Sequence, residues 1–194
     1  FLLTTAQHQE KFVLQRVSEH VFPDPHLVQR QSQRVIEHLL NCEEFSNRYR
    51  VPKLQTSKTG EFHHVGETGF WRLWRYLANT QVVESFENPA QIALTARAFA
   101  DYQRALLDLP GEPLVATIEG FLQLDFYLQQ FDEVAKKAPK DLMRSVAHLH
   151  RQGHVFSKFN AHVHADCKVN NLLFNAHGSD VAAVIDLDTT MYGH

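Results

Sequence analysis

Four side chains that could do chemistry lie within one short segment, in the order H-x-D-x-K-x-x-N: His164, Asp166, Lys168 and Asn171. The catalytic loop of kinases carries an H-R-D triplet and, after four further residues, an Asn; Asp166 and Asn171 have that spacing. An Asp at this place orients an acceptor hydroxyl and takes its proton, which contributes roughly 10²–10⁴ to the rate. Lys168 can reach the transferring phosphate and offset its charge. The segment therefore predicts Asp166 and Lys168 as catalytic residues of phosphoryl transfer, with His164 bracing the loop through hydrogen bonds.

A second acidic motif follows fifteen residues after Asn171, where the apolar segment Val184-Ile185 ends in Asp186. Kinases place a second metal ligand at such a position. Magnesium prefers hard oxygen ligands, so an amide oxygen and a carboxylate suit it. We therefore predict Asn171 and Asp186 as metal ligands.

These signals have alternatives. An H-x-D triplet and an Asp–Asn pair five residues apart each occur by chance, and only their combination with the downstream acidic segment favours a kinase. His162, His164 and Cys167 could instead be ligands of zinc. The pattern H-x-H-x-x-C has no matching second pair, however, because Cys42 is remote in the sequence.

The N-terminal half offers candidates for nucleotide binding. Arg16 ends the apolar run Phe12–Leu14, where a kinase carries its phosphate-contacting lysine, although a surface arginine fits the pattern equally well. Glu37 follows on the next helix and could pair with Arg16 or belong to a solvated face. Tyr76 and Leu77 end the segment expected to reach the hinge that meets adenine. We predict these four residues, Arg16, Glu37, Tyr76 and Leu77, as the cofactor-binding set.

The elements that must position the N-terminal candidates follow from pattern and punctuation. Asp24 is a suitable N-cap and Pro25 suits the first helical position, and the apolar residues that follow recur on one helical face. The predicted order is β-β-α-β-β-β, with strands at 1–5 and 11–17, a helix reaching about Leu40, and a meander within 51–77.

Near 78–88 the predicted elements change from mainly strands to mainly helices, and we place there a boundary between an N-lobe (1–80) and a C-lobe (81–194). Asn88 caps and Pro89 opens a strong amphipathic helix. Further predicted elements are helices at 123–137 and 140–152, strands around 163, at 171–174 and at 181–187, and a hairpin turn at 175–180.

Composition excludes several classes of protein. The net charge is -3, which favours neither a nucleic-acid nor an acidic-membrane partner. No apolar run is long enough to span a membrane, and Phe1-Leu2-Leu3 lacks the basic leader of a signal peptide. Two distant cysteines cannot form a disulfide framework, so we expect a reducing cytoplasmic environment. Because the chain opens on Phe, we expect that its true start precedes it.

At this point the sequence resembles a known family, the aminoglycoside phosphotransferase superfamily, in the branch that contains N-acetylhexosamine 1-kinase. The most specific motifs are His164-x-Asp166-x-Lys168-x-Asn170-Asn171-x-Leu173-Phe174 and Ile185-Asp186-Leu187-Asp188-Thr189-x-Met191-x-Gly193. Leu14-Gln15-Arg16-Val17, Val21-Phe22-x-x-Pro25 and Gly69-Phe70-Trp71-Arg72 support them. The resemblance runs through nearly the whole chain in the same order.

The resemblance implies an α+β, two-lobed protein-kinase-like fold, with an antiparallel β-sheet N-lobe and a mostly helical C-lobe that is truncated here. It also implies ATP, Mg²⁺ and a small-molecule hydroxyl acceptor, in this branch the anomeric hydroxyl of an N-acetylhexosamine. Asp188 becomes a second acid near the metal. Two positions depart from the family pattern: Ala165 replaces the usual Gly, and Cys167 replaces a common Thr. The glycine-rich phosphate loop would precede Phe1.

Three other functions remain open from the sequence. The same fold could phosphorylate an aminoglycoside, choline or a hydroxylated amino acid. It could also serve as a non-catalytic kinase-like binding domain, although the catalytic positions are all occupied. A zinc protein is the remaining alternative. The sequence does not indicate an oligomeric state.

Overall fold

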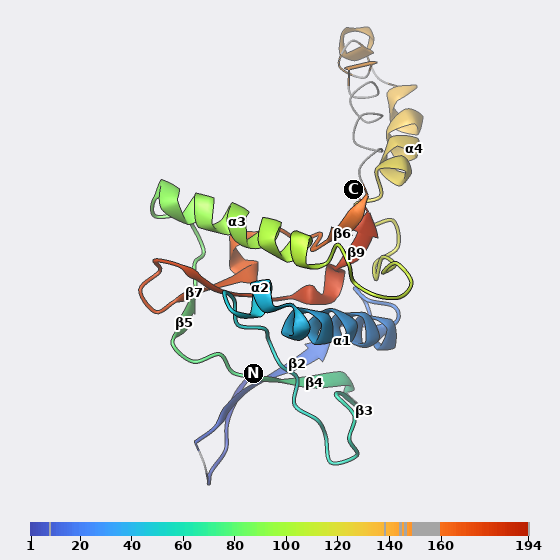
Figure 1. Ribbon diagram of the computed structural model, residues 1–194. Helices are drawn as coiled ribbons and strands as arrows, with labels where there is room; N and C mark the ends of the chain where they lie inside the picture. The colour runs from blue at the N-terminus through green and yellow to red at the C-terminus, as the bar shows by residue number, and fades with distance from the viewer. Residues whose placement is uncertain (8, 138, 144, 146, 149–159, 194) are drawn as a thin grey trace.

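The computed structural model describes residues 1–7, 9–137, 139–143, 145, 147–148 and 160–193 (Figure 1). Its helices are α1 (Pro25–Asn41), α2 (Glu43–Ser46), α3 (Pro89–Ala105) and α4 (Leu124–Ala135). Its strands are β1 (Leu2–Thr4), β2 (Lys11–Val17), β3 (His64–Gly66), β4 (Gly69–Arg75), β5 (Thr80–Val82), β6 (Ala161–Val163), β7 (Leu172–Asn175), β8 (Val181–Val184) and β9 (Met191–Gly193). Short 3₁₀ turns are η1 (Lys140–Leu142), η2 (Val169–Asn171) and η3 (Leu187–Thr189).

The N-terminal sheet is antiparallel and has the strand order β1-β2-β4-β3. Its long central pair, β2 and β4, brings Gln15 opposite Arg72 and Val17 opposite Phe70. Side chains alternate along a strand, so these four residues share one face of the sheet. That face is the buried one, because Val17, Phe70 and Arg72 are at most 2% exposed.

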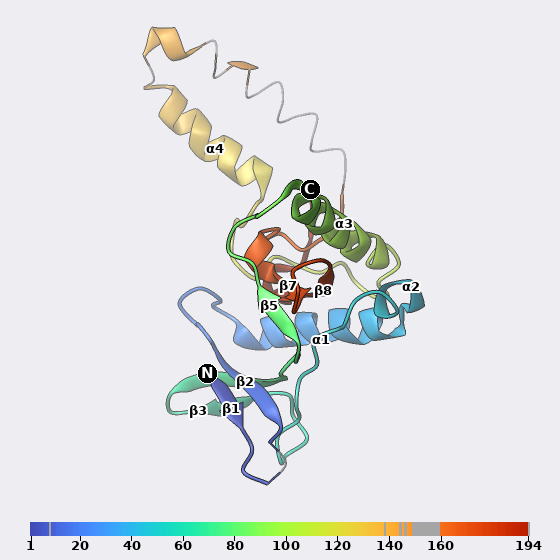
Figure 2. The same ribbon diagram turned by 90° about the vertical axis from the view of Figure 1, so that its left-hand side faces the viewer.

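Helix α1 lies across this sheet, between it and the rest of the protein (Figures 1 and 2). The helix begins as predicted: Asp24 Oδ1 accepts a hydrogen bond from Leu27 N (2.9 Å), and Pro25 occupies the first turn. Its buried stripe includes Ser32 and Val35, which places one face of the helix against the C-terminal segments that carry the acidic motif.

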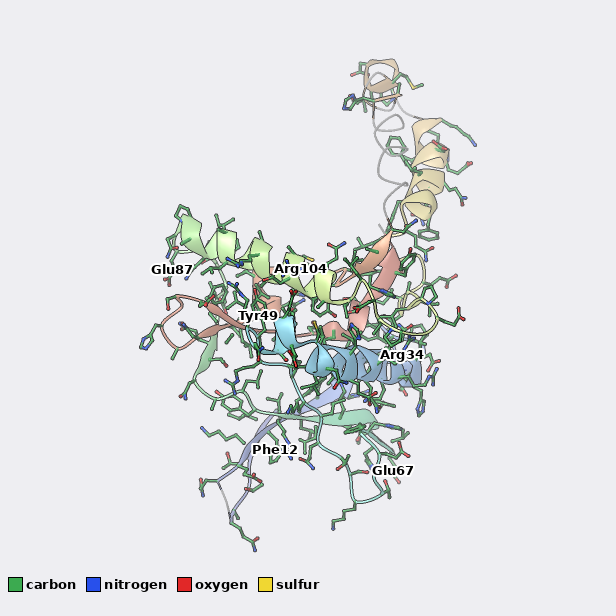
Figure 3. The ribbon with its side chains drawn as sticks, in the orientation of Figure 1. Phe12, Arg34, Tyr49, Glu67, Glu87 and Arg104 are labelled. Carbon is green, nitrogen blue, oxygen red and sulfur yellow. The ribbon has the colours of Figure 1, made fainter. Side chains whose placement is uncertain are left out.

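The second half contains the sheet β5-β7-β8 and a separate β6–β9 pair, all antiparallel. Helix α3 covers β8, and its N-cap Asn88 accepts from Gln91 N (3.1 Å). Helix α2 is tied to α3 by Tyr49, whose hydroxyl donates to Asp101 Oδ2 (2.9 Å); Figure 3 labels Tyr49 beside α2 and below Arg104 of α3. The hydrophobic core therefore runs continuously from α1 through α2 and α3 to β7 and β8.

Helix α4 projects away from this body, as both views show (Figures 1 and 2). Its Phe126, Tyr127 and Val134 are exposed. The predicted helix 140–152 begins as the 3₁₀ turn η1 and then falls largely outside the described residues. Among the residues that the structure describes, no helix is both long and apolar enough to cross a membrane.

One expectation for the N-terminal half is corrected. The meander has only two full strands, β3 and β4, and Leu54 contributes an isolated bridge to Trp74. Its strand cannot extend, because β3 already occupies the same edge of β4. Strand β5 pairs with β7 of the second sheet, so the chain joins the second sheet within the predicted boundary segment. The short helix α2 was not predicted.

Candidate active site

The catalytic-loop segment connects β6 to η2 and is fixed by His164. The ring Nε2 of His164 donates to the Ile185 carbonyl oxygen (2.9 Å), and the Nδ1 accepts from Asp166 N (3.3 Å). Burial lowers the pKa of His164, so that the neutral ring with its proton on Nε2 is favoured. The predicted bracing role is thus observed: His164 ties the catalytic loop to the end of β8.

Asp166 lies at the centre of a small hydrogen-bond network. Its Oδ2 accepts from Lys168 Nζ (2.6 Å) and from Asn171 Nδ2 (2.9 Å). Burial raises the pKa of Asp166, but these two hydrogen bonds outweigh it and leave the pKa below its usual value. The carboxylate is therefore ionised at neutral pH and about a third exposed (32%), as a base that must meet a hydroxyl requires.

Asp186 follows β8 in a left-handed backbone conformation, with φ 61° and ψ 58°. Burial, and then the charge of Asp188, raise the pKa of its carboxyl. A carboxyl whose pKa is raised is one whose charge a cation would stabilise, and Asp186 remains exposed to solvent. Asn171 lies beside it, because Ile185 N donates to Asn171 O (2.9 Å). Since the Asn171 amide nitrogen donates to Asp166, its amide oxygen remains available to a cation.

A cavity of about 750 Å³ opens between the two sheets above these residues. Predicted site residues from both halves of the chain line it: Arg16, Tyr76, Leu77, Asn171 and Asp186. Two hard-oxygen donors at a cavity large enough for a nucleotide fit Mg²⁺, which usually takes one or two protein ligands together with phosphate oxygens and water. Asn171 and Asp186 would hold that ion, which would neutralise charge on the transferring phosphate.

Three predicted residues are placed otherwise than expected. Arg16 lies on the sheet face opposite Gln15, so its side chain is exposed at the rim of the cavity. Of the two alternatives for Glu37, the structure shows the solvated face, since Glu37 lies on the exposed side of α1 and accepts a hydrogen bond from Gln33 (2.8 Å). Asp188 is 4% exposed and is absent from the cavity lining; its two oxygens accept from Ser32 and Arg72.

The sequence analysis missed Arg72. Its strand, Gly69–Arg75, lies in the predicted meander, and Arg72 was named only within the supporting motif Gly69-Phe70-Trp71-Arg72, without a role. A signal was present, because Arg72 has the same parity as Phe70 and Trp74, so a strand with one buried face must bury the arginine too. A buried arginine requires an acidic partner, and the structure supplies Asp188.

The histidines of the zinc alternative are occupied by backbone groups. His162 Nδ1 lies 3.1 Å from the Leu106 carbonyl oxygen, and Leu114 N donates to His162 Nε2 (3.4 Å). Burial and the Asp166 charge raise the pKa of the Cys167 thiol, which disfavours the thiolate that zinc binds. Across the described part of the chain, no three His, Cys, Asp or Glu residues are grouped to hold a metal.

These buried histidines make stability depend on pH. Burial lowers the pKa of both His162 and His164 below 6.5, so that below pH 6.5 the unfolded chain binds protons that the folded chain does not. We expect the free energy of unfolding to fall as pH drops below 6.5, by at most about 1.4 kcal/mol per pH unit for each histidine. Urea unfolding between pH 5 and 7.5 measures this slope. His162→Gln, which cannot titrate, should flatten it; an unchanged slope in that variant would contradict the assignment.

The Ala165 backbone predicts a stabilising substitution. Its φ is 65°, and the left-handed region costs a non-glycine residue about 1–2 kcal/mol. Glycine removes this strain but adds about 0.4–1 kcal/mol of unfolded-state entropy. We expect Ala165→Gly to stabilise the fold by about 0.5 kcal/mol, or raise Tm by roughly 1–2 °C. Ala96→Gly, on the exposed side of α3, should instead destabilise by about 1 kcal/mol. If calorimetry showed that both variants are less stable than the wild type, the Ala165 backbone would not be strained.

The two sheets, the helix α1 packed between the N-terminal sheet and the rest of the protein, and the cavity define a protein-kinase-like fold of the phosphotransferase class. The chain belongs to the phosphotransferase enzyme family APH, which matches residues 1–194.

Solved structures agree with this fold. An aminoglycoside phosphotransferase from Alicyclobacillus acidocaldarius has a TM-score of 0.55 and 14% identity, over 99% of this chain and 60% of that one. The amicoumacin kinase hAmiN, in complex with AMP-PNP, Ca²⁺ and Ami, has a TM-score of 0.60 and 14% identity, over 99% and 56%. A putative aminoglycoside phosphotransferase from Ralstonia eutropha has a TM-score of 0.58 and 18% identity, over 100% and 56%.

At such identities the likeness concerns the fold, and it confirms the predicted α+β, two-lobed architecture. The chain spans between 56% and 60% of the length of these three structures.

Proposed function

We propose that this protein transfers the γ-phosphoryl group of ATP to a hydroxyl of a small molecule. The observation that carries the proposal is the hydrogen-bond network of Asp166 with Lys168 and Asn171, of which Asn171 lines the cavity together with Asp186. Family membership supports the reaction class. The proposal is also supported by contacts between separate segments: Asn171 Nδ2 donates to Asp166 Oδ2, and Ile185 N, next to Asp186, donates to Asn171 O.

Each group then has a distinct task. Asp166 orients the acceptor hydroxyl and takes its proton as the new P–O bond forms and ADP leaves. The hydrogen bond to Asp166 raises the pKa of Lys168, which therefore stays cationic beside the reacting oxygens and offsets charge on the phosphoryl group. Asn171 and Asp186 hold Mg²⁺, which shields the phosphate oxygens.

The nucleotide would occupy the cavity between the sheets. Tyr76 and Leu77 lie where the chain passes from β4 toward β5 and line the cavity, which supports the proposal that this hinge meets adenine. Arg16 is placed to approach the nucleotide only from the rim. Glu37 does not line the cavity, so any effect of Glu37 on nucleotide binding would be indirect.

For the acceptor we propose a sugar, an N-acetylhexosamine phosphorylated at its anomeric hydroxyl, in the cytoplasm. The support is the resemblance of the two C-terminal motifs to the N-acetylhexosamine 1-kinase branch. An antibiotic acceptor is the second candidate, since one solved structure with this fold is an amicoumacin kinase.

A screen that follows ADP release separates these acceptors. The full-length protein is incubated with Mg²⁺ and ATP and with one acceptor at a time: N-acetylglucosamine, N-acetylgalactosamine, streptomycin or choline. A sugar phosphorylated at the anomeric carbon loses its reducing end, which a reducing-sugar assay detects. ADP release with streptomycin alone would overturn the sugar assignment and leave the reaction class in place.

A further inference from the structure

Arg72 presents a charged group that the protein itself satisfies only in part. Its side chain is 1% exposed, although it belongs to the strand that forms one wall of the cavity. Nε donates to Gln15 Oε1 (3.1 Å), and Nη2 donates to Asp188 Oδ2. Nη1 is buried and has no hydrogen-bond partner among the described residues. A buried charged donor left unpaired is costly, so it implies a partner that is present when the protein works.

The environment of Arg72 fixes its guanidinium in one orientation. Trp74 Nε1 donates to the same Gln15 oxygen (2.7 Å), and the guanidinium carbon lies 4.8 Å from the Trp74 ring centroid. On the other side, Ser32 Oγ donates to Asp188 Oδ1 (3.2 Å) and Thr117 Oγ1 donates to the Asp188 carbonyl oxygen (2.7 Å). A group held from the sheet, from α1 and from η3 is preorganised.

The residue whose Nη1 lacks a partner is also part of the cavity wall. Arg72, Asn171 and Asp186 all line the cavity, so Arg72 and the proposed metal ligands border the same space. In strand β2, Arg16 points to the other face; Lys11 shares the face of Gln15 but lies at the exposed end of the strand, with Nζ 5.7 Å from the Tyr76 ring centroid. The only arginine held rigidly at this face within the described chain therefore comes from the adjacent strand β4.

We infer that Arg72 is the nucleotide's phosphate-binding cation: Asp188 and Gln15 hold the guanidinium, and Nη1 donates to a phosphate oxygen of ATP. The inference rests on the proposed function and deepens it by assigning the contact to β4, where the sequence pointed to Arg16 on β2. Nη1 is buried beneath the cavity surface, so nucleotide binding includes a small adjustment of the wall that exposes this donor. Asp188 is then a positioning residue for Arg72.

The test compares ligands with and without phosphates. Calorimetric titration with adenosine, ADP and ATP, each with Mg²⁺, is carried out on the full-length protein and on Arg72→Met and Arg72→Lys. We expect Arg72→Met to raise the Kd of ADP and ATP by roughly 10–100-fold, the loss of one charge-assisted hydrogen bond, and to change the Kd of adenosine less than about twofold. Arg72→Lys keeps the positive charge but lacks the forked guanidinium, so its Kd for ADP and ATP should lie between those of the wild type and Arg72→Met.

Two further variants keep the test decisive. Arg72→Met leaves Asp188 buried without its cation, so the double variant Arg72→Met/Asp188→Asn removes that unpaired charge and should show the same selective loss of ATP. Ser32→Ala weakens the hold on Asp188 without removing a cation, and should change the Kd of ATP much less than Arg72→Met does. Equal losses of affinity for adenosine and ATP, or an unchanged affinity for ATP in the folded variants, would overturn the role of Arg72 and leave the proposed function in place. A wild-type protein that binds no ATP would overturn the proposed function with it.

Discussion

Replacing Asp166 by Asn should lower phosphoryl transfer by about 10²–10⁴-fold in the full-length protein. The amide cannot take the proton of the acceptor hydroxyl, and it loses the negative charge that holds Lys168 Nζ at 2.6 Å. The side-chain oxygen of Asn can still accept from Asn171, so the loop geometry should persist. ADP release with saturating acceptor measures the loss, and circular dichroism checks the fold.

Asp108→Asn is the matched control for that substitution. Asp108 follows α3, its side chain is 88% exposed, and its partner is His38. The same chemical change there should leave turnover within about twofold of wild type, since a surface pair contributes little. If Asp166→Asn turned over at a rate close to that of Asp108→Asn, Asp166 would not be the base.

Replacing Asp186 by Asn should have the second largest effect. Because Asn tolerates the left-handed backbone that Asp186 adopts, the substitution preserves the chain path while removing one anionic metal ligand. A bound metal contributes several kcal/mol to the transition state, so a loss of about 10²-fold or more in kcat is expected. A higher Mg²⁺ concentration should be needed for half-maximal rate.

Titration of both proteins with Mg²⁺ at fixed ATP distinguishes a metal ligand from a structural residue. Substitution of a ligand shifts the metal dependence and leaves the binding of metal-free adenosine unchanged. Half-maximal activity at the wild-type Mg²⁺ concentration, with kcat also unchanged, would contradict the assignment of Asp186. Asp180→Asn, in the β7–β8 turn, is a control that should shift neither quantity.

The sequence predicted the parts of the site that local structure determines. Asp166 and Asn171 are five residues apart, and a single loop and one 3₁₀ turn bring them together. Asp186 follows through one hairpin, β7–β8, whose turn residues are recognisable in the sequence. Helix starts at Asp24 and Asn88 were likewise predictable, because capping depends on residues within one turn.

The parts that depend on distant partners were not predicted. Arg72 and Asp188 are 116 residues apart, and no local pattern indicates which acid an inward-facing arginine will meet. Whether Glu37 pairs with Arg16 stayed open in the sequence for a related reason. Strand parity and helix phase must both be right for such a pair, and an error of one residue in either turns the side chain to the other face. Strand β5 was not predicted, because its partner β7 follows some ninety residues later.

The most direct test of the central claim follows the γ-phosphoryl group itself. The full-length protein is incubated with Mg²⁺ and ATP labelled in the γ-phosphate, in the presence of N-acetylglucosamine or N-acetylgalactosamine. We expect label to appear in an acid-labile sugar phosphate in equal amount to ADP, to require Mg²⁺, and to form about 10²–10⁴-fold more slowly in Asp166→Asn. Binding of Mg²⁺ and ATP without transfer of label to these sugars or to any other hydroxyl acceptor would contradict phosphotransferase activity and indicate a binding domain.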